Sequence, residues 1–272
     1  MNKKIYVISG ATSGIGKSLV EALSKDSKVF AGYRSEEKLE DLKNISSNVE
    51  PFYVDYAKPE TISSAVEYIK SKTDKVDTLI NIAGCVVAGP IEKISIDEIR
   101  RQFNVNVFGH LEIAQGLAEM LTNGKIINVS SMASFGIFPF ISPYCASKRA
   151  LDMFFNSFLI ENKRNIQVVS IKPGVIVTPL WEKSIKENLG HIDRTNDYEK
   201  EMEFLVANAK KNETKGLNVQ DVVKTILKAD KSKNPKLTYL VGKDAKFAHI
   251  FSKLPQNVVN YFVKLGLKAR MK

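Results

Sequence analysis

The feature that most restricts the fold of this chain is a glycine-rich turn between a short apolar run and a helical pattern. The apolar run covers residues 4–9, and glycines follow at positions 10, 14 and 16. A strand, a glycine turn and a helix in this order direct backbone N–H groups and the positive end of the helix dipole at an anion. The segment predicts the first unit of a nucleotide-binding sheet, although its Gly-x-x-x-Gly-x-Gly spacing differs from the commoner Gly-x-Gly-x-x-Gly.

Six further strand-like segments alternate with helical patterns along the chain. They cover residues 28–35, 49–55, 75–84, 124–131, a run that starts at 166, and 237–242, with helices expected at 36–42, 59–71, 96–121 and around Tyr144. This alternation predicts a doubly wound, mostly parallel seven-stranded α/β sheet of the Rossmann type. We expect one domain over residues 1–242, followed by a basic amphipathic helical tail over 243–272.

Composition restricts the class of protein and its partners. Hydrophobic residues make up 44% of the chain and charged residues 26%, as in soluble globular proteins, and no apolar run is long enough to span a membrane. Cys85 and Cys145 are the two cysteines and have no metal-ligand neighbours, which favours a reducing, cytoplasmic location and no metal site. The net charge is +10, but no nucleic-acid motif accompanies it, so no nucleic-acid partner is expected.

A serine, a tyrosine and a lysine form the pattern with the clearest chemical meaning. Tyr144 follows Ser131 by thirteen residues, and Lys148 follows Tyr144 by four. Residues at i and i+4 share a helix face, so the ammonium can lie near the phenol and lower its pKa, while a hydroxyl can hydrogen-bond a substrate oxygen. Tyr-x-x-x-Lys also arises by chance on helices, so the spacing from Ser131 and the other motifs carry the prediction of a proton-transfer site.

The end of the second strand predicts the cofactor. In a dinucleotide-binding unit an acid at this place hydrogen-bonds the adenosine ribose, whereas an arginine accommodates a 2′-phosphate. Tyr33 and Arg34 stand there without an acid, which favours NADP(H) over NAD(H) unless Arg34 is a solvated surface residue. Asp55, at the end of the third strand, can accept a hydrogen bond from the adenine amino group. Asn106, within a long helical run, is either a structural hydrogen-bonder or part of a site.

Taken together, these residues resemble the short-chain dehydrogenase/reductase family over residues 3–242. The matching motifs are Ser9-Gly10-x-x-x-Gly14-Ile15-Gly16, Asn81-x-Ala83-Gly84, Asn106, Ser131, Tyr144-x-x-x-Lys148 and Pro173-Gly174 with Thr178. Ser9 replaces the usual threonine but keeps its hydroxyl, and Ile82 stands where a second asparagine is common. Several independent matches in the family's order make the resemblance specific.

The resemblance implies a role for each of these residues. Tyr144 would be the catalytic acid–base, Ser131 would polarise the carbonyl oxygen, Lys148 would lower the Tyr144 pKa and hold the nicotinamide ribose, and Asn106 would support a proton relay to Lys148. The cofactor chemistry itself would belong to the nicotinamide. The implied cofactor-binding residues are Gly10, Ser13, Gly14, Ile15, Gly16, Arg34, Asp55, Tyr56, Asn81, Ala83, Gly84, Tyr144, Lys148, Pro173, Gly174, Ile176 and Thr178.

The resemblance extends to the hydroxysteroid and retinol dehydrogenase branch through the run around Tyr144 and the exit at Arg34. It implies a lipophilic secondary alcohol or ketone as substrate, NADP(H) as cofactor, and a homodimer or homotetramer. A reductase of 3-oxoacyl thioesters is a second interpretation, against which the C-terminal tail counts. A non-catalytic NADP-binding regulator is a third, and it would require a broken site, whereas the four catalytic positions are intact.

Substrate specificity is expected in residues 86–94, 135–143 and a lid at about 179–216. Within the lid, Met202, Leu205, Val206 and Ala209 share one helix face, which fits either a lid or a helix packed on the core.

The tail carries seven Lys or Arg against one Asp from residue 243 onward, so +6 of the net charge lies there. Its two apolar faces, at 247–254 and 258–265, fit packing on the protein or a neighbouring subunit, which we prefer, or weak contact with a membrane surface.

Overall fold

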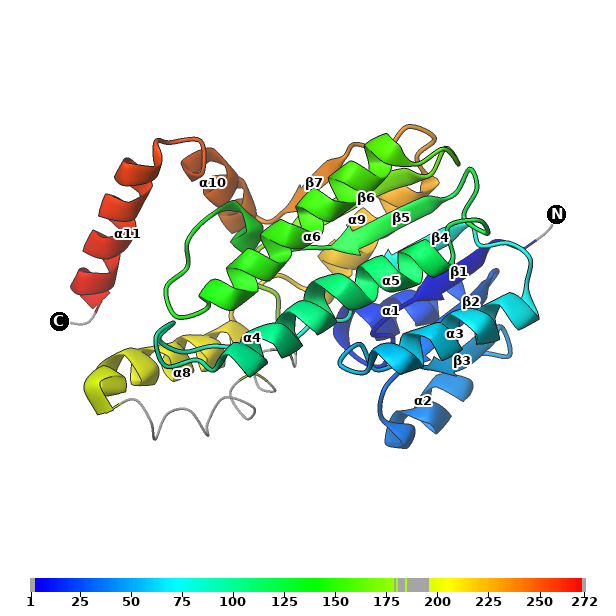
Figure 1. The fold of residues 1–272 in the computed structure, drawn as a ribbon, viewed down its shortest axis with the longest axis horizontal. Coiled ribbons are helices and arrows are strands. Elements are labelled where there is room, and N and C mark those ends of the chain that lie inside the picture. Colours follow the sequence, from blue (N-terminus) through cyan, green and yellow to red (C-terminus); the bar gives the residue numbers. More distant parts are fainter. Residues whose placement is uncertain (1–2, 179, 181–183, 185–195, 271–272) are drawn as a thin grey trace.

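Seven parallel strands form the sheet that the sequence predicts (Figure 1). The structure is a computed structural model that describes residues 3–178, 180, 184 and 196–270. In these residues the strand order is β3-β2-β1-β4-β5-β6-β7, and each neighbouring pair is parallel. The strands are β1 (Ile5–Ile8), β2 (Lys28–Tyr33), β3 (Val49–Tyr53), β4 (Thr78–Asn81), β5 (Lys125–Val129), β6 (Gln167–Pro173) and β7 (Thr238–Val241).

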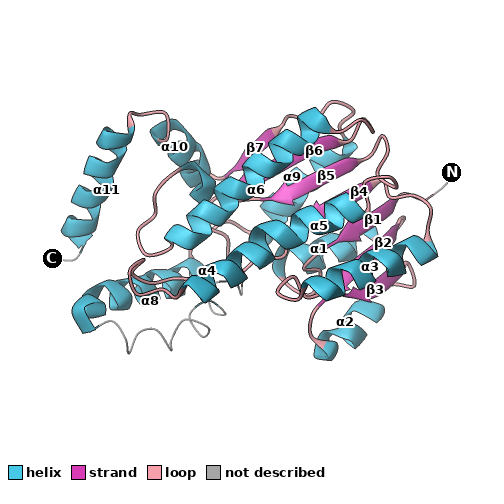
Figure 2. Ribbon diagram, in the orientation of Figure 1, coloured by secondary structure: helices cyan, strands magenta, loops and turns pink. Residues whose placement is uncertain are grey.

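Helices cover both faces of this sheet (Figure 2). They are α1 (Gly14–Leu23), α2 (Leu39–Lys43), α3 (Pro59–Lys72), α4 (Ile96–Phe103), α5 (Gly109–Gly116), α6 (Ser142–Glu161), α8 (Glu199–Thr214), α9 (Val219–Lys231), α10 (Lys243–Phe251) and α11 (Gln256–Arg270). Among the described residues, no helix is long and apolar enough to cross a membrane.

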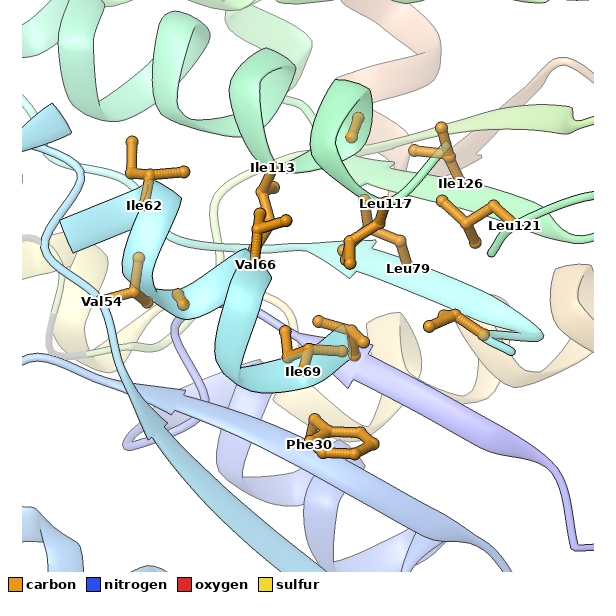
Figure 3. Packing of buried hydrophobic residues seen from close by; sticks show 14 of the residues in the cluster. Phe30, Val54, Ile62, Val66, Ile69, Leu79, Ile113, Leu117, Leu121 and Ile126 are labelled. Atoms are coloured by element: carbon orange, nitrogen blue, oxygen red, sulfur yellow. The ribbon is translucent and has the colours of Figure 1, made fainter. Parts of the chain in front are cut away.

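The side chains of each strand point alternately to the two faces of the sheet, and this produces two separate cores. Val7 of β1 faces a core shared with α3, α5 and α6, whereas its neighbours Tyr6 and Ile8 face a core shared with α1 and α9. Successive side chains of a strand point to opposite faces, so each buried strand needs apolar residues throughout. Figure 3 shows the first core, in which side chains from α3 and α5 pack onto strand residues such as Phe30, Leu79 and Ile126.

The helices differ from the prediction in two places. The long helix expected over residues 96–121 ends at Gly116 and contains a π-helical turn, Asn104–Phe108, between α4 and α5. π-turns frequently mark functional sites, and this one contains Asn106. Helix α9 was not predicted, although a capping residue, Asn218, precedes it and its buried residues Val222, Val223 and Ile226 follow helical spacing.

The strand order locates the site. From β1 the chain continues to β2 on one side, whereas from β4, the other neighbour of β1, it continues to β5 on the opposite side. In open parallel sheets, ligands bind outside the carboxyl ends of the strands at such a reversal. The glycine turn follows β1, so the predicted phosphate-binding segment lies at this edge.

Candidate active site

The glycine turn leaves room for a phosphate because side chains are excluded from it. Gly10 has φ of 67°, and a Cβ there would lie 2.9 Å from the backbone nitrogen of Ala83. Ser13, the extended N-cap residue of α1, makes no side-chain capping hydrogen bond, and the first turn of α1 has no acidic residue. Backbone N–H groups at this helix start can therefore receive an anion, which fits the pyrophosphate of a dinucleotide.

One cavity joins the glycine turn to the strand ends on both sides of it. Most residues predicted from the sequence line it: Gly10, Ser13, Gly14, Ile15, Arg34, Asp55, Tyr56, Ala83, Gly84, Ser131, Tyr144, Lys148, Pro173, Gly174, Ile176 and Thr178. Thr12, Gly32, Val54 and Cys85, which were not predicted as site residues, also line it, as do Val86 and Ser184 from the expected specificity segments. Thr12 lies within the glycine turn, and Val54 adjoins Asp55, so their positions in the sequence could have indicated them.

Gly16, Asn81 and Asn106 do not line the cavity. A Cβ on Gly16 would collide with the carbonyl of Gly10, so this glycine allows α1 to approach β1 closely. Asn81 is 1% exposed and donates a 2.8 Å hydrogen bond to Asn128 on the adjacent strand β5. Its neighbours Ile82 and Ala83 line the cavity at this point, so the cofactor contact expected for Asn81 stays a prediction.

Ser9 connects the two halves of the site. Its hydroxyl accepts hydrogen bonds from Ile82 N at 3.0 Å and Ala83 N at 3.3 Å. These contacts fix the end of β1 against the end of β4 and bring the glycine turn beside Ala83. Serine and threonine both carry the hydroxyl that makes these contacts, so Ser9 can replace the usual threonine.

Tyr144 and Ser131 lie together in the cavity, just beyond the end of β5. Ser131 caps the 3-10 turn Met132–Phe135, accepting a 3.1 Å hydrogen bond from Ala133 N, and Tyr144 lies in the first turn of α6. Burial raises the pKa of Tyr144 to about 12, and a hydrogen bond with Ser131 opposes this rise. The net shift of the Tyr144 pKa is therefore upward, because desolvation of the phenol dominates, and the lowering by Lys148 expected from the resemblance stays a prediction.

Lys148 is a buried cation behind the tyrosine. Its Nζ lies 5.9 Å from the Tyr144 ring centroid and donates a 3.0 Å hydrogen bond to Val129 O. Burial lowers the pKa of Lys148 to about 8, while the negative charge of Asp152 raises it. A pKa of about 8 lies close to neutral pH, so the amine of Lys148 can gain or lose a proton in that range.

Asn106 holds the wall beside Lys148. Its Oδ1 accepts from Cys85 N at 2.9 Å, and its Nδ2 donates to Cys85 O and Ser147 Oγ, each at 3.0 Å. A Cβ on Gly84 would lie 3.4 Å from Asn106 Oδ1 and 3.7 Å from Lys148 Nζ, so the three residues are close neighbours. The side chain of Asn106 therefore joins the backbone of Cys85 to Ser147 on α6, and its expected part in a proton relay stays a prediction.

A buried ion pair lies on α6 one turn after Lys148. Asp152 Oδ2 lies 2.7 Å from Lys172 Nζ, and its Oδ1 accepts a 2.8 Å hydrogen bond from Ser170. The ammonium of Lys172 also lies 4.2 Å from the ring centroid of Phe135, at the end of the turn that starts after Ser131. This network joins α6, β6 and the Ser131 turn.

Asp244 at the start of α10 reaches the loop after β6. Its Oδ2 accepts a 2.7 Å hydrogen bond from Val175 N, and a Cβ on Gly174 would collide with its carboxylate. Gly174, Ile176 and Thr178 of this loop line the cavity, so the tail supports the cavity wall through one carboxylate. Sequence reasoning missed this contact because the two segments lie far apart in the chain.

The wall around Tyr144 is apolar. Val86, Ala133, Tyr144 and Cys145 form a small buried cluster, against which Phe138, Ile141 and Leu180 pack. The predicted specificity segments at 86–94 and 135–143 both contribute to it. In the predicted lid, Met202 of α8 is buried, whereas residues 179, 181–183 and 185–195 lie outside the described residues.

Comparison with known proteins identifies the chain. A family profile described as short chain dehydrogenase matches residues 4–189. The chain belongs to the short-chain dehydrogenase family. Solved structures that match its fold include a short chain dehydrogenase from Burkholderia cenocepacia in complex with NADP, with a TM-score of 0.73 at 22% identity, covering 96% of this chain and 98% of the other. Another from Burkholderia phymatum, in complex with NAD, has a TM-score of 0.75 at 18% identity, covering 87% of this chain and 89% of the other.

Relatives of this short-chain dehydrogenase cover nearly its whole length. It is 30% identical to an NADPH-dependent 3-dehydrocapnine reductase of Ornithobacterium rhinotracheale, covering 96% of each chain. It is 30% identical to estradiol 17-beta-dehydrogenase 2 of Mus musculus, covering 98% of this chain and 75% of the relative. A short-chain dehydrogenase structure from Streptomyces avermitilis matches its fold with a TM-score of 0.78 at 20% identity, covering 99% of this chain and 98% of the other.

Proposed function

We propose that this short-chain dehydrogenase transfers a hydride between NADP(H) and a lipophilic secondary alcohol or ketone. The observation that carries the proposal is the convergence of Ser131, Tyr144 and Lys148 in one cavity with the glycine turn. The nicotinamide, when bound, supplies or accepts the hydride. The glycine turn would hold its pyrophosphate, and Lys148 its ribose hydroxyls.

In the proposed reduction, Tyr144 gives its phenolic proton to the carbonyl oxygen as the hydride arrives at the carbonyl carbon. Its raised pKa keeps the phenol protonated at neutral pH, as a general acid requires. Ser131 hydrogen-bonds the same oxygen as negative charge develops on it. The cation of Lys148 stabilises the phenolate that remains. Asn106, which hydrogen-bonds Ser147, holds the neighbouring residues Lys148 and Gly84 in place.

Arg34 supports the choice of NADP(H). It is exposed, lines the cavity at the end of β2 and, among the described residues, makes no ion pair, so its guanidinium is available to a 2′-phosphate. Such charge-assisted contacts are among the stronger hydrogen bonds of proteins. The neighbouring Asp55 carboxylate accepts from Ala57 N at 3.0 Å and lines the adenine end proposed from the sequence.

The apolar wall around Tyr144 supports a lipophilic substrate, as does the steroid estradiol in the name of one relative. A homodimer or homotetramer is part of the proposal, on the basis of the family. We find no specific observation that favours a 3-oxoacyl thioester or a regulatory role.

A panel of steroid, retinoid, long-chain and short aliphatic ketones, assayed with NADPH and NADH in parallel, tests the proposal. NADPH oxidation with at least one lipophilic ketone is expected, with slower oxidation of NADH. Activity confined to short aliphatic ketones would reject the substrate class, and equal rates with both cofactors would reject the cofactor preference.

A further inference from the structure

The tail helices α10 and α11 expose apolar side chains that the proposed reaction does not use. Phe247, Ile250 and Leu254 are spaced along one face of α10 and the turn after it, and are 68%, 66% and 43% exposed. The opposite face of α10 packs on the protein, with Ala245 buried and His249 against Phe135 at 4.8 Å between ring centroids. The exposed face of α10 therefore takes no part in packing this helix on the protein.

Helix α11 continues the same apolar surface. Tyr261, Phe262 and Leu265 are at least half exposed, whereas Val259 is buried. Ring contacts connect the two helices in a chain: Phe247 with Phe251 at 5.8 Å, Phe251 with Phe262 at 6.3 Å, and Phe262 with Tyr261 at 5.6 Å. In Figure 1, α11 stands apart from the sheet, and no residue of 243–270 lines the described cavity. The tail thus does not cover the substrate cavity.

The charges around this surface have one sign. Lys246 and Lys253 flank the face of α10, and Lys264 and Lys268 flank that of α11, all of them exposed. Asp244, the single acid from residue 243 onward, is turned inward to Val175 N at 2.7 Å. An exposed aromatic face bordered by lysines has the composition of helices that lie in a membrane interface, whereas lysine is depleted at protein–protein interfaces.

We propose that the tail helices dock the enzyme on an anionic lipid surface. The face made by Phe247, Ile250, Leu254, Tyr261, Phe262 and Leu265 enters the interface, and the flanking lysines lie at the level of the lipid phosphates. Neither helix crosses the bilayer. We prefer this proposal to the packing expected from the sequence, because this face is uncovered in the described chain and its border is basic. It does not depend on the substrate or cofactor.

Sedimentation of the full chain with vesicles tests it. We expect the enzyme to bind vesicles that contain phosphatidylcholine and phosphatidylserine, more weakly at high salt, and to bind pure phosphatidylcholine poorly. Lys264→Glu combined with Lys268→Glu should weaken binding by at least about tenfold, since each lysine near an anionic surface contributes roughly a factor of five. The control reverses Lys224 and Lys228 of α9, which have the same spacing and should leave binding unchanged.

Tyr261→Ser combined with Leu265→Ser tests the apolar part and should also release the enzyme from vesicles. Ile160→Ser is its control, because Ile160 is 84% exposed on α6 and lies outside the tail. NADPH affinity should not change in any of these variants. Absence of wild-type binding to anionic vesicles would overturn the proposal, as would equal losses in the tail variants and their controls. A change of mass in light scattering with unchanged vesicle binding would assign the face to a second copy of the chain.

Discussion

The catalytic region and the tail helices use the same kinds of side chain in opposite ways. Around α6 and β6, Lys148 and Lys172 are 4% and 7% exposed, and each ammonium has a defined partner. In α10 and α11 the lysines face solvent and the aromatic rings beside them are uncovered. Both regions contain amphipathic helices, so the pattern of residues alone does not separate them.

The difference lies in burial and its consequences. Buried polar groups must be paired, and their protonation is shifted by the surrounding protein, as for Tyr144 and Lys148. Substitutions there should therefore change stability and chemistry together. Substitutions on the exposed face of the tail should change where the enzyme binds and leave its chemistry intact.

The largest expected effect on stability is loss of the buried ion pair. Asp152→Ala would leave Lys172 without its partner, and removal of one member of a buried pair costs about 3–5 kcal/mol. Urea unfolding would measure this loss. The control is Asp97→Ala, which removes an exposed pair with Arg100 and should cost less than about 1 kcal/mol. Similar losses in both variants would mean that burial does not separate the two classes of pair.

A smaller effect is expected for the cofactor. Arg34→Ala removes the proposed partner of the 2′-phosphate, and a hydrogen bond to a charged group contributes about 1.5–3 kcal/mol. NADPH affinity should fall about 10- to 150-fold, and NADH affinity should remain unchanged. Binding titrations of both cofactors would show this, with Arg100→Ala as an exposed control. Equal weakening of NADPH and NADH would contradict the assignment of Arg34.

A third effect concerns a buried histidine beside the site. His110 Nε2 hydrogen-bonds Ala83 O at 2.7 Å, and burial together with the positive charge of Lys148 lowers its pKa to about 3. The unfolded chain binds a proton at His110 below about pH 6.5 and the folded chain does not until about pH 3. Stability should therefore fall as the pH falls through this window, by at most about 1.4 kcal/mol per pH unit from this group.

His110→Gln removes that contribution. The difference in unfolding free energy between the wild type and this variant should shrink from pH 7 to pH 5. Only the wild type loses stability through the protonation equilibrium of His110 in this range. Unfolding at several pH values measures the slope, which is independent of any constant loss of packing. Parallel slopes in the two proteins would show that His110 titrates normally.

Several parts of this account were accessible from the sequence because they are local. The glycine turn, the seven strands and the Tyr144–Lys148 spacing each lie within a short stretch, and the structure brings Ser131, Tyr144 and Lys148 to one cavity. The family motifs also placed Arg34 at the end of β2. These features depend on strand and helix periodicity, which a single segment contains.

The remaining features depend on contacts between distant segments. Asn81 was expected in the cavity, but its partner Asn128 on the neighbouring strand could not be seen from the motif. The contacts of Asp244 with Val175 and of Asp152 with Lys172 join separate elements. The upward shift of the Tyr144 pKa could not be predicted from the motif, because it depends on how completely the fold buries the phenol.

The most direct test of the account is Tyr144→Phe, with Tyr261→Phe as its control in the tail. The first variant removes the proposed proton donor while it keeps the ring, and the second removes an exposed hydroxyl. With a ketone that the wild type reduces, turnover of Tyr144→Phe should fall by about two to four orders of magnitude, as expected for lost general acid catalysis, with NADPH affinity retained. Tyr261→Phe should keep wild-type turnover. Near-normal turnover of Tyr144→Phe would contradict the central claim that this buried phenol transfers the proton.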